Sequence, residues 1–239
     1  MISLHRLGVR FGGLVALDEV TAELRAPVVG LIGPNGAGKS SLLDALSGLV
    51  PVQPATRLLL DQLPLHPLSP RQRALAGLRR AFQHDALVPE RSVADNVAVA
   101  LDARPGSRAD KAAALQQALQ GADLWPLREA PCGRLDRFER RRVAWARALA
   151  GGARLLLLDE PAAGLPPHQR AALAAWLERV HADTGTQTLL VEHDLRLVAR
   201  CCEEVLVLQQ GRLLAHGPTA QVLADARVRA ACAGAGATL

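Results

Sequence analysis

Short apolar runs alternate with helix-spaced apolar positions along the second half of the chain. The expected elements are, in order, strand 154–159, helix 167–182, strand 186–192, helix 194–200 and strand 203–209. Strands that alternate with helices in this way are typical of a parallel sheet. After a turn at Gly211 we expect a strand at 212–217, a short helix beyond Ala220 and a frayed end at AGAGATL.

The first half of the chain has shorter apolar runs and more turns. We expect strands at 2–10, 14–24, 26–33, 55–61 and 76–82, with a proline-rich loop between the last two. A helix at 39–48, closed by Gly48, follows a glycine-rich loop. Helical patterns then occupy 92–121, with a break at Pro105-Gly106, and 138–150.

These patterns together predict an α/β fold built from two parts. We expect a core formed by residues 1–83 and 151–239, with a parallel sheet and an antiparallel β portion near the N-terminus. The helices of about 84–150 form a block inserted between the sheet segments, which we call the helical lobe. We find neither an internal repeat nor a clean linker, so the chain is expected to be one domain.

The composition permits a packed core and argues against several classes of protein. Of 239 residues, 49% are apolar, yet no apolar run approaches the ~20 residues of a membrane-spanning helix. The first residues lack the apolar stretch of a secretory signal, so we expect a cytoplasmic protein. A net charge of +5 suggests nucleic acid, but tyrosine is absent and aromatic residues are 3%, which argues against a base-stacking surface and a nucleic-acid partner. The four cysteines lack C-x-x-C spacing, and we expect reduced thiols rather than a zinc site.

One loop carries a phosphate-binding pattern. The run Gly33-Pro34-Asn35-Gly36-Ala37-Gly38-Lys39-Ser40, which we call the phosphate loop, matches G-x-x-x-x-G-K-[ST] between an expected strand and an expected helix. The glycines let backbone N–H groups turn inward around phosphates, and the start of the helix adds partial positive charge. Lys39 would then reach the β and γ oxygens of ATP, and Ser40 would supply a hydroxyl to Mg²⁺.

An acidic pair follows the buried strand in LLLLDEP. Asp159 and Glu160 lie at the C-terminal end of that strand, the edge at which open α/β sheets bind ligands. Asp159 can hold Mg²⁺ directly or through water, and Glu160 can take the proton of an attacking water. Because such pairs are common in ordinary loops, this one indicates function only together with the phosphate loop.

These two motifs, with VEHDLRLV at 191–198, resemble the ATP-binding subunits of ABC transporters over nearly the whole chain. Within that family, the stretches RFGGLVAL, GPNGAGKS, FQH, EPAAGL and VEHDL are most similar to subunits that energise branched-chain amino acid uptake. The resemblance implies a P-loop ATPase fold, two subunits that sandwich ATP head to tail, and transmembrane permease subunits as partners. It also implies a peripheral location on the cytoplasmic face of a bacterial inner membrane.

The resemblance gives roles to residues that the pattern alone leaves open. Gln83 would be the loop glutamine that senses Mg²⁺ and contacts the membrane partner, and His193 the switch histidine that hydrogen-bonds the γ-phosphate. Phe11 lies where the family places an aromatic ring against adenine, although it could instead fill a strand core. The expected catalytic residues are Glu160 and His193, and the expected Mg²⁺ ligands are Ser40, Gln83 and Asp159. The expected ATP ligands are Phe11, Gly33, Pro34, Asn35, Gly36, Ala37, Gly38, Lys39, Ser40, Ser41 and Gln83.

Residues 135–139, which we call the signature segment, depart from the family. Family members carry Leu-Ser-Gly-Gly-Gln there and close it over the ATP of the partner subunit, whereas this chain reads Leu-Asp-Arg-Phe-Glu. Asp136 places a carboxylate where a γ-phosphate is gripped, and Phe138 adds bulk where glycine permits close approach. Asp136 and Glu139 also have the spacing of a reciprocal helix cap, and both interpretations can hold. Pro166 replaces the family's Asp or Asn and removes a hydrogen bond between the subunits.

We therefore predict an ATPase subunit that energises an ABC transporter, importing branched-chain amino acids or similar small polar solutes. An intact phosphate loop beside an altered signature segment predicts a heterodimer with a second ATP-binding subunit, and weak hydrolysis by this chain alone. One alternative is a non-transport ATPase of this fold that acts on ribosomes or DNA, a class that usually carries tandem cassettes or long coiled insertions. Another is a regulatory ATP-binding module with little turnover.

Overall fold

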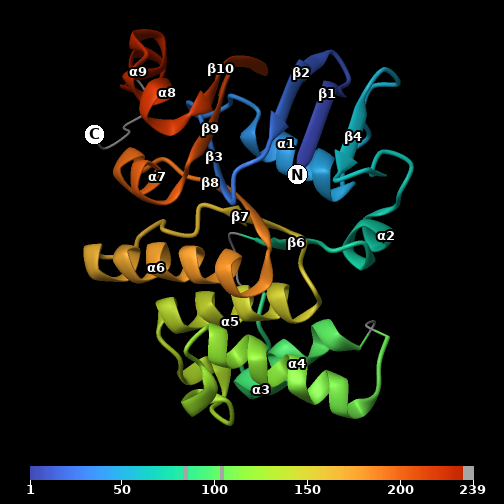
Figure 1. Ribbon diagram of the computed structural model, residues 1–239, viewed down its shortest axis with the longest axis vertical. Helices are drawn as coiled ribbons and strands as arrows, with labels where there is room; N and C mark the ends of the chain where they lie inside the picture. Colours follow the sequence, from blue (N-terminus) through green and yellow to red (C-terminus); the bar gives the residue numbers. More distant parts are fainter. Residues whose placement is uncertain (83–85, 103–104, 234–239) are drawn as a thin grey trace.

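The computed structural model describes residues 1–82, 86–102 and 105–233. Two sheets occupy one end of the molecule and a group of helices occupies the other (Figure 1). The smaller sheet is antiparallel, with strand order β2-β1-β4-β5. Its strands are β1 (Ile2–Phe11), β2 (Leu14–Leu24), β4 (Arg57–Leu60) and β5 (Leu63–Pro64).

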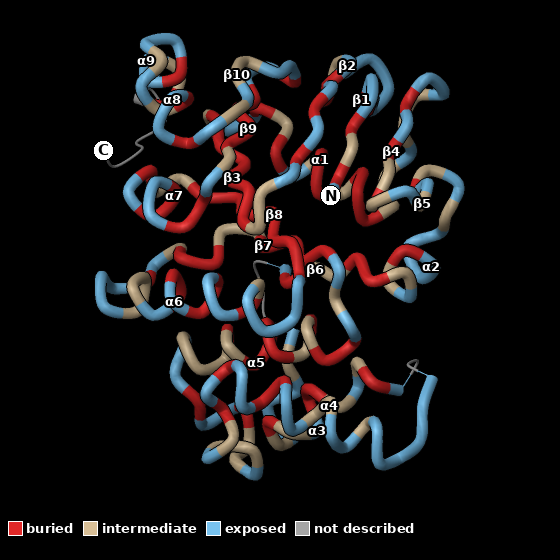
Figure 2. Tube along the Cα trace, viewed as in Figure 1, coloured by how far each residue is buried: buried red, intermediate tan, exposed pale blue. Residues whose placement is uncertain are grey.

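The larger sheet lies at the centre of the molecule, and its strand order is β10-β9-β3-β8-β7-β6. All neighbours are parallel except β10, which pairs antiparallel with β9 at one edge. Its strands are β3 (Val28–Ile32), β6 (Leu78–Ala81), β7 (Leu155–Asp159), β8 (Gln187–Val191), β9 (Glu204–Gln209) and β10 (Arg212–Pro218). Figure 2 shows β3, β7, β8 and β9 as the buried centre, which explains their apolar sequences, since both faces are covered.

The alternation of side chains along β3 divides the core of this part into two. Val29 and Leu31 pack with α1 and the antiparallel sheet, whereas Val28 and Ile32 pack with α6, α7 and α9 on the opposite face. The helices around the sheets are α1 (Lys39–Ser47), α2 (Pro70–Leu75), α6 (Pro167–Thr184), α7 (Leu195–Cys201), α8 (Thr219–Ala224) and α9 (Ala226–Ala233). Because β3, β7 and β8 are parallel neighbours, the loops that follow them meet at one edge of the sheet.

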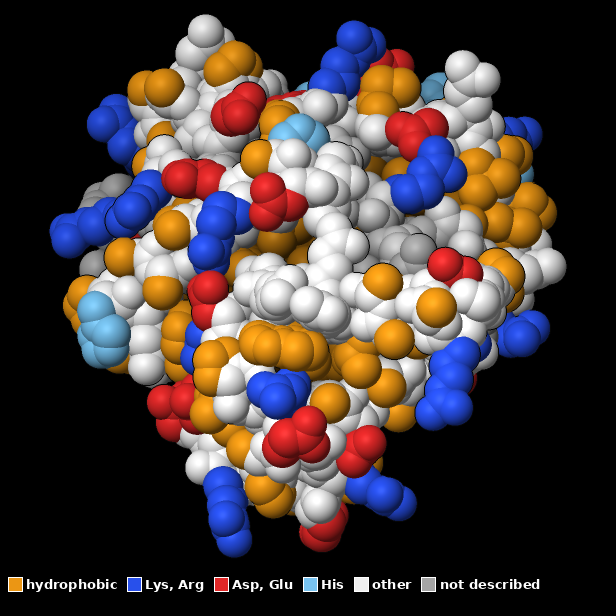
Figure 3. Space-filling view, turned by 60° about the horizontal axis from the view of Figure 1, so that its bottom comes forward, with side chains coloured by type: hydrophobic (Ala, Val, Ile, Leu, Met, Phe, Trp, Pro, Cys, Tyr) orange, Lys and Arg blue, Asp and Glu red, His pale blue; other side chains and the backbone are white. Residues whose placement is uncertain are grey.

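The helices between β6 and β7 have an apolar core of their own. They are α3 (Val93–Ala98), α4 (Arg108–Gly121) and α5 (Arg137–Ala150), with 3₁₀ turns at Val99–Leu101, Trp125–Leu127 and Cys132–Arg134. The view from this end of the molecule shows apolar side chains interspersed with basic and acidic side chains (Figure 3). Among the described residues, none of the helices combines the length and the apolar character that crossing a membrane requires.

The predicted α/β class and the order of its main elements are confirmed, and the differences have local causes. The proline-rich loop contains α2, which begins with a capping box between Ser69 and Gln72 and is too short to show a period. The helical stretch 92–121 is interrupted at Pro105-Gly106 as predicted, with α3 and a 3₁₀ turn before the break and α4 after it, and α5 begins one residue earlier than expected, at Arg137. The tail forms two helices, and the expected frayed end, residues 234–239, lies outside the described part of the chain.

Candidate active site

The phosphate loop joins β3 to α1, and its glycines are required by its backbone. Gly33, Gly36 and Gly38 have φ angles of 145°, 75° and 102°, which side-chain-bearing residues rarely adopt. Two of them also lie against neighbouring backbone. A Cβ on Gly33 would lie 2.1 Å from the carbonyl oxygen of Leu208, and one on Gly38 would lie 2.7 Å from that of Ala16. The spacing of the motif therefore follows from both conformation and packing.

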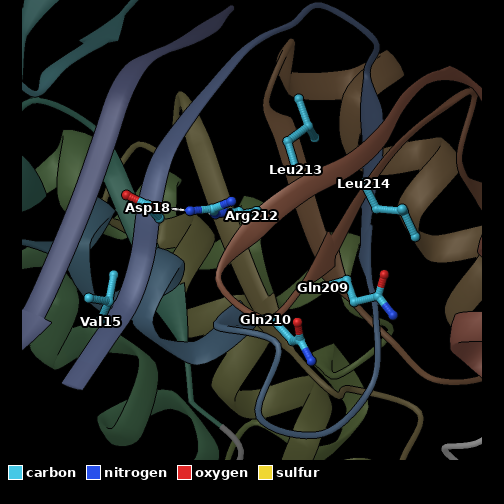
Figure 4. A pocket seen from close by; sticks show the side chains of 7 residues that line it. All are labelled: Val15, Asp18, Gln209, Gln210, Arg212, Leu213 and Leu214. Carbon is cyan, nitrogen blue, oxygen red and sulfur yellow. Dashed lines mark hydrogen bonds and ion pairs between the residues drawn. The ribbon is translucent and has the colours of Figure 1, made fainter.

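The turn between β9 and β10 supports the phosphate loop from one side. The N–H of Gly211 donates to the carbonyl of Ala37 at 3.0 Å, and the N–H of Asp18 donates to the carbonyl of Gly211 at 2.8 Å. Beside this contact, β2 and the β9–β10 hairpin enclose a hollow of about 470 Å³. Figure 4 shows Asp18 and Arg212 joined at this hollow by an ion pair of 2.7 Å, so the hairpin is tied to β2.

Lys39 is enclosed by the loop that precedes it. Its ammonium donates to the carbonyls of Gly33 at 2.8 Å and Pro34 at 3.0 Å, and the residue is 6% exposed. Burial lowers the pKa of Lys39, while the negative charges of Glu160 and Asp159 oppose that shift. A buried cation thus lies within the influence of the acidic pair.

The first turn of α1 leaves room for an anion. Gly38 occupies the N-cap without a side-chain hydrogen bond, so the first N–H groups of this helix have no side-chain cap. Ser40, in the same turn, is exposed. Ser40 and Ser41 therefore have the positions that the sequence motif predicted for them, next to the phosphate loop.

The donor chemistry at this edge of the sheet fits Mg²⁺. Ser40 contributes a hydroxyl and Asp159 a carboxylate, and both are hard oxygen ligands of the kind that Mg²⁺ prefers. Across the described ranges, no group of three or more His, Cys, Asp or Glu side chains could form a protein-only metal site. Mg²⁺ is usually bound by one or two carboxylates together with phosphates, so a carboxylate and a hydroxyl next to the phosphate loop form a donor set that suits it.

Glu160 and His193 meet at the ends of two neighbouring strands. The Nε2 atom of His193 lies 2.6 Å from Oε1 of Glu160, and both side chains are half-buried. Glu160 has a φ of 49°, an uncommon conformation for a side-chain-bearing residue, and its N–H donates to the carbonyl of Val191 at 3.0 Å. The pairing of β7 with β8 thus brings the two predicted catalytic residues into contact.

The outcome differs for the two remaining predicted ligands. Phe11 lies at the end of β1 and is 46% exposed, so the alternative that it fills a strand core is wrong. An exposed aromatic ring next to a tight turn is available for stacking on a ligand. Gln83 lies outside the described residues.

The signature segment forms the start of α5. Asp136 is the N-cap, and its Oδ1 accepts from the N–H of Glu139 at 2.7 Å while Oε2 of Glu139 accepts from the N–H of Asp136 at 2.9 Å. Phe138 contacts Trp145 edge to face at 6.0 Å, and Trp145 stacks on Trp176 at 4.8 Å. The predicted capping pair is therefore confirmed, and Phe138 packs toward α6.

Pro166 occupies the N-cap of α6. Its φ of −68° suits proline, and α6 consequently begins without a side-chain cap. The loop 161–166, which we call the linking loop, ends here and connects Glu160 to α6. An Asp or Asn at this position would have offered the cap that proline lacks.

Two residues near the acidic pair were not predicted as part of the site. Glu192 is 4% exposed and accepts from the N–H of Ala162 at 2.7 Å, and burial raises its pKa to about 7. Arg80 on β6 forms an ion pair with Asp159. The sequence shows Arg80 only as part of the basic stretch RRAF, and no periodic signal distinguishes it from Arg79.

Comparison with known proteins agrees with this geometry. The family model described as ABC transporter matches residues 17–163. The chain is 34% identical over 238 residues to the high-affinity branched-chain amino acid transport ATP-binding protein LivG of Escherichia coli (strain K12), with 93% of both chains covered. It is also 34% identical over 226 residues to the thiamine import ATP-binding protein ThiQ of Cereibacter sphaeroides, covering 94% of this chain and 95% of that one. Among solved structures, the ADP conformation of MJ1267, an ATP-binding cassette of an ABC transporter, has a TM-score of 0.87 at 23% identity over 98% of each chain, a likeness in fold.

Proposed function

This chain belongs to the ABC transporter family and is an ATPase of that type, and from this premise we propose that it is the peripheral subunit that energises a solute importer. The observation that supports the proposal most is the shared edge of the large sheet. There a buried lysine enclosed by the phosphate loop lies within the influence of a carboxylate that contacts a histidine. This arrangement combines phosphate binding with a proton acceptor.

We propose the following roles in ATP hydrolysis. The N–H groups of the phosphate loop and Lys39 bind the β- and γ-phosphates, and the exposed ring of Phe11 stacks on adenine. Ser40 and Asp159 would hold Mg²⁺, with Gln83 as a further ligand, and the ion would supply positive charge to the phosphates. Glu160 takes the proton of the attacking water, and His193 orients Glu160 through their 2.6 Å contact and lies next to the γ-phosphate.

We propose further that the working assembly is asymmetric. ATP-binding subunits of this family work with transmembrane permeases and dimerise, and each site is completed by the signature of the other subunit. In this chain Asp136 and Glu139 are engaged in capping α5, and Asp136 adds a negative charge where a γ-phosphate would approach. A sibling subunit with an unaltered signature would complete the site built on this chain, and the site facing Asp136 would turn over slowly.

The transported solute is inferred from sequence similarity alone. LivG is named for branched-chain amino acid transport and ThiQ for thiamine import, at the same identity of 34%. We favour branched-chain amino acids or similar small polar solutes, because the stretches around the phosphate loop, the acidic pair and His193 are most similar to that subfamily. We place the protein on the cytoplasmic face of a bacterial inner membrane, bound to permease subunits.

The proposal is tested with purified chain, first alone and then with a sibling ATP-binding subunit. Calorimetry should detect Mg²⁺-ATP binding by the chain alone, with feeble hydrolysis, and hydrolysis should rise when the sibling is added. Glu160→Gln should abolish the added hydrolysis while binding persists. Robust, cooperative hydrolysis by the pure homodimer would refute the asymmetry, and unchanged transport with Glu160→Gln would make the chain a regulatory module.

A further inference from the structure

Arg80 is a buried cation that bridges two carboxylates of the site. It lies on β6, and its side chain is 8% exposed. One guanidinium nitrogen contacts Oδ1 of Asp44 on α1 at 2.5 Å, and the other contacts Oδ2 of Asp159 at the end of β7 at 2.9 Å. A single planar group therefore connects the helix that follows the phosphate loop with the carboxylate of the acidic pair.

The surroundings of Arg80 fix the position of its guanidinium. The group lies 4.7 Å from the centre of the ring of Phe82, which directly follows the last residue of β6. Asp44 is on the same helix as Lys39 and Ser40, so the bridge is part of the phosphate-binding edge rather than a distant surface pair. Neither carboxylate is fully exposed, and their side-chain exposures are 32% for Asp44 and 15% for Asp159.

We propose that Arg80 competes with Mg²⁺ for Asp159 and so sets the magnesium concentration at which the nucleotide site fills. This inference rests on the proposed function, because it takes Asp159 as a ligand of Mg²⁺. The guanidinium and the metal ion are both cations, and each is stabilised by the same carboxylate, so a stronger hold by one weakens the hold of the other. Asp44 makes the exchange possible, because it keeps Arg80 paired while Asp159 turns toward the metal.

The arrangement distinguishes Arg80 from its neighbour on β6. Arg79 donates to the carbonyl of Gly151 at 2.6 Å, on the opposite side of the strand from Asp159. The two residues have the same charge and adjacent positions, and they differ in whether they reach the site. Arg79→Gln is therefore a matched control for Arg80→Gln, since both remove one positive charge from β6.

The test measures how binding of a non-hydrolysable ATP analogue depends on Mg²⁺. For Arg80→Gln we expect the Mg²⁺ concentration at half-maximal binding to fall about tenfold, the size expected when one partly screened charge next to the metal is removed. Arg80→Lys should lie between the wild type and Arg80→Gln, because it keeps the charge but cannot contact both carboxylates at once. Arg79→Gln should stay within about twofold of the wild type, as expected for a charge screened from the site.

A second measurement reports the metal directly. Mn²⁺ replaces Mg²⁺, and the loss of its free electron paramagnetic resonance signal is recorded with the same analogue for each variant. An unchanged or higher metal requirement in a folded Arg80→Gln variant would overturn the inference. If that variant does not fold, Asp44→Asn replaces it in the test. This substitution leaves Asp159 as the carboxylate partner of Arg80, so it should raise the metal requirement. A lower or unchanged metal requirement would overturn the inference.

The two proposals fail in different ways. If the wild-type chain binds no nucleotide at any Mg²⁺ concentration, the proposed function fails. If the wild type binds nucleotide with Mg²⁺ but Arg80→Gln and Arg79→Gln have the same metal requirement, the proposed function stands and the role of Arg80 is refuted.

Discussion

Replacing Asp136 separates its structural role from its expected effect on nucleotide binding. Asp136→Ser keeps a side-chain oxygen that can cap α5, whereas Asp136→Ala removes it, and both remove the carboxylate. The cap contact of 2.7 Å and the reciprocal contact of 2.9 Å indicate a fully formed capping box. Loss of an N-cap typically costs about 1 kcal/mol, while serine and aspartate are nearly equivalent caps.

The stability of the two variants should therefore differ. We expect Asp136→Ala to lower the free energy of unfolding by about 1 kcal/mol more than Asp136→Ser does, or roughly 2–4 °C more in Tm for a chain of this size, because only alanine removes the cap. Asp136→Ser loses mainly the favourable charge at the helix N-terminus, about 0.3–1 kcal/mol at an exposed position. Urea unfolding followed by circular dichroism measures both changes.

The effect of the two substitutions on nucleotide affinity should differ from their effect on stability. Two unit charges ~4 Å apart at an effective dielectric of ~20 repel by roughly 4 kcal/mol, and screening at an exposed site reduces this value. In the proposed heterodimer with a sibling subunit, both variants should raise ATP affinity at the site facing Asp136, by about tenfold or more if ~1.4 kcal/mol of the repulsion is relieved. Equal affinity for the wild type and both variants in an assembled heterodimer would refute the reasoning that the carboxylate weakens this site.

Three further predictions concern stability. The pKa of the Glu192 carboxyl is about 7 in the folded protein and near 4.5 in the unfolded chain. The free energy of unfolding should therefore fall by about 3 kcal/mol as pH rises between these two values. Urea titrations across pH should show this fall for the wild type and not for Glu192→Gln. Gly33→Ala should lower the free energy of unfolding in urea by about 3 kcal/mol, because its Cβ would lie 2.1 Å from the carbonyl oxygen of Leu208. Gly36→Ala is the control: its Cβ would have no atom within 4 Å, so it should lower the free energy of unfolding only by the ~1 kcal/mol of its strained backbone conformation. Arg73→Met should lower the thermal midpoint by several degrees, at about 1–3 kcal/mol, because it removes the Arg73 donor from the buried carbonyls of Ala45 and Leu46 at the end of α1, of which Ala45 keeps the N–H of Gly48.

The class of fold and the main elements could be predicted because the central strands are continuously apolar. Strands such as β3 and β8 are buried on both faces, and the helices between them have clear ends, such as Gly48 after α1. The order of the strands in the sheet could not be predicted, because the sequence of a strand that is apolar on both faces does not indicate which strands lie next to it. The placement of β3 between β8 and β9 is therefore information that the structure adds.

The candidate site was predictable where a motif fixes its own geometry. The phosphate loop has this property, because its glycines are needed by its backbone whatever surrounds it. The role of His193 was expected only through the family resemblance, and its contact with Glu160 was not predicted, because that contact depends on the pairing of β7 with β8. Arg80 was not predictable, because which of two adjacent arginines faces the site depends on how β6 pairs with β7.

The linking loop, residues 161–166, is held by its own chain from three directions. Its anchors are the Arg141 side chain on the Pro161 carbonyl, Glu192 on the Ala162 N–H, and Arg170, which donates to the Leu165 carbonyl and pairs with Asp194. The contacts to the loop thus come from α5, from the residue after β8 and from α6, and Asp194 before α7 holds Arg170 in place. Because Pro166 offers neither an N–H nor a polar side chain, this end of the loop cannot donate a hydrogen bond to a partner subunit. A loop held by its own subunit, with no donor at Pro166, fits the proposed asymmetric assembly, because such a loop would transmit little of the state of one site to the other.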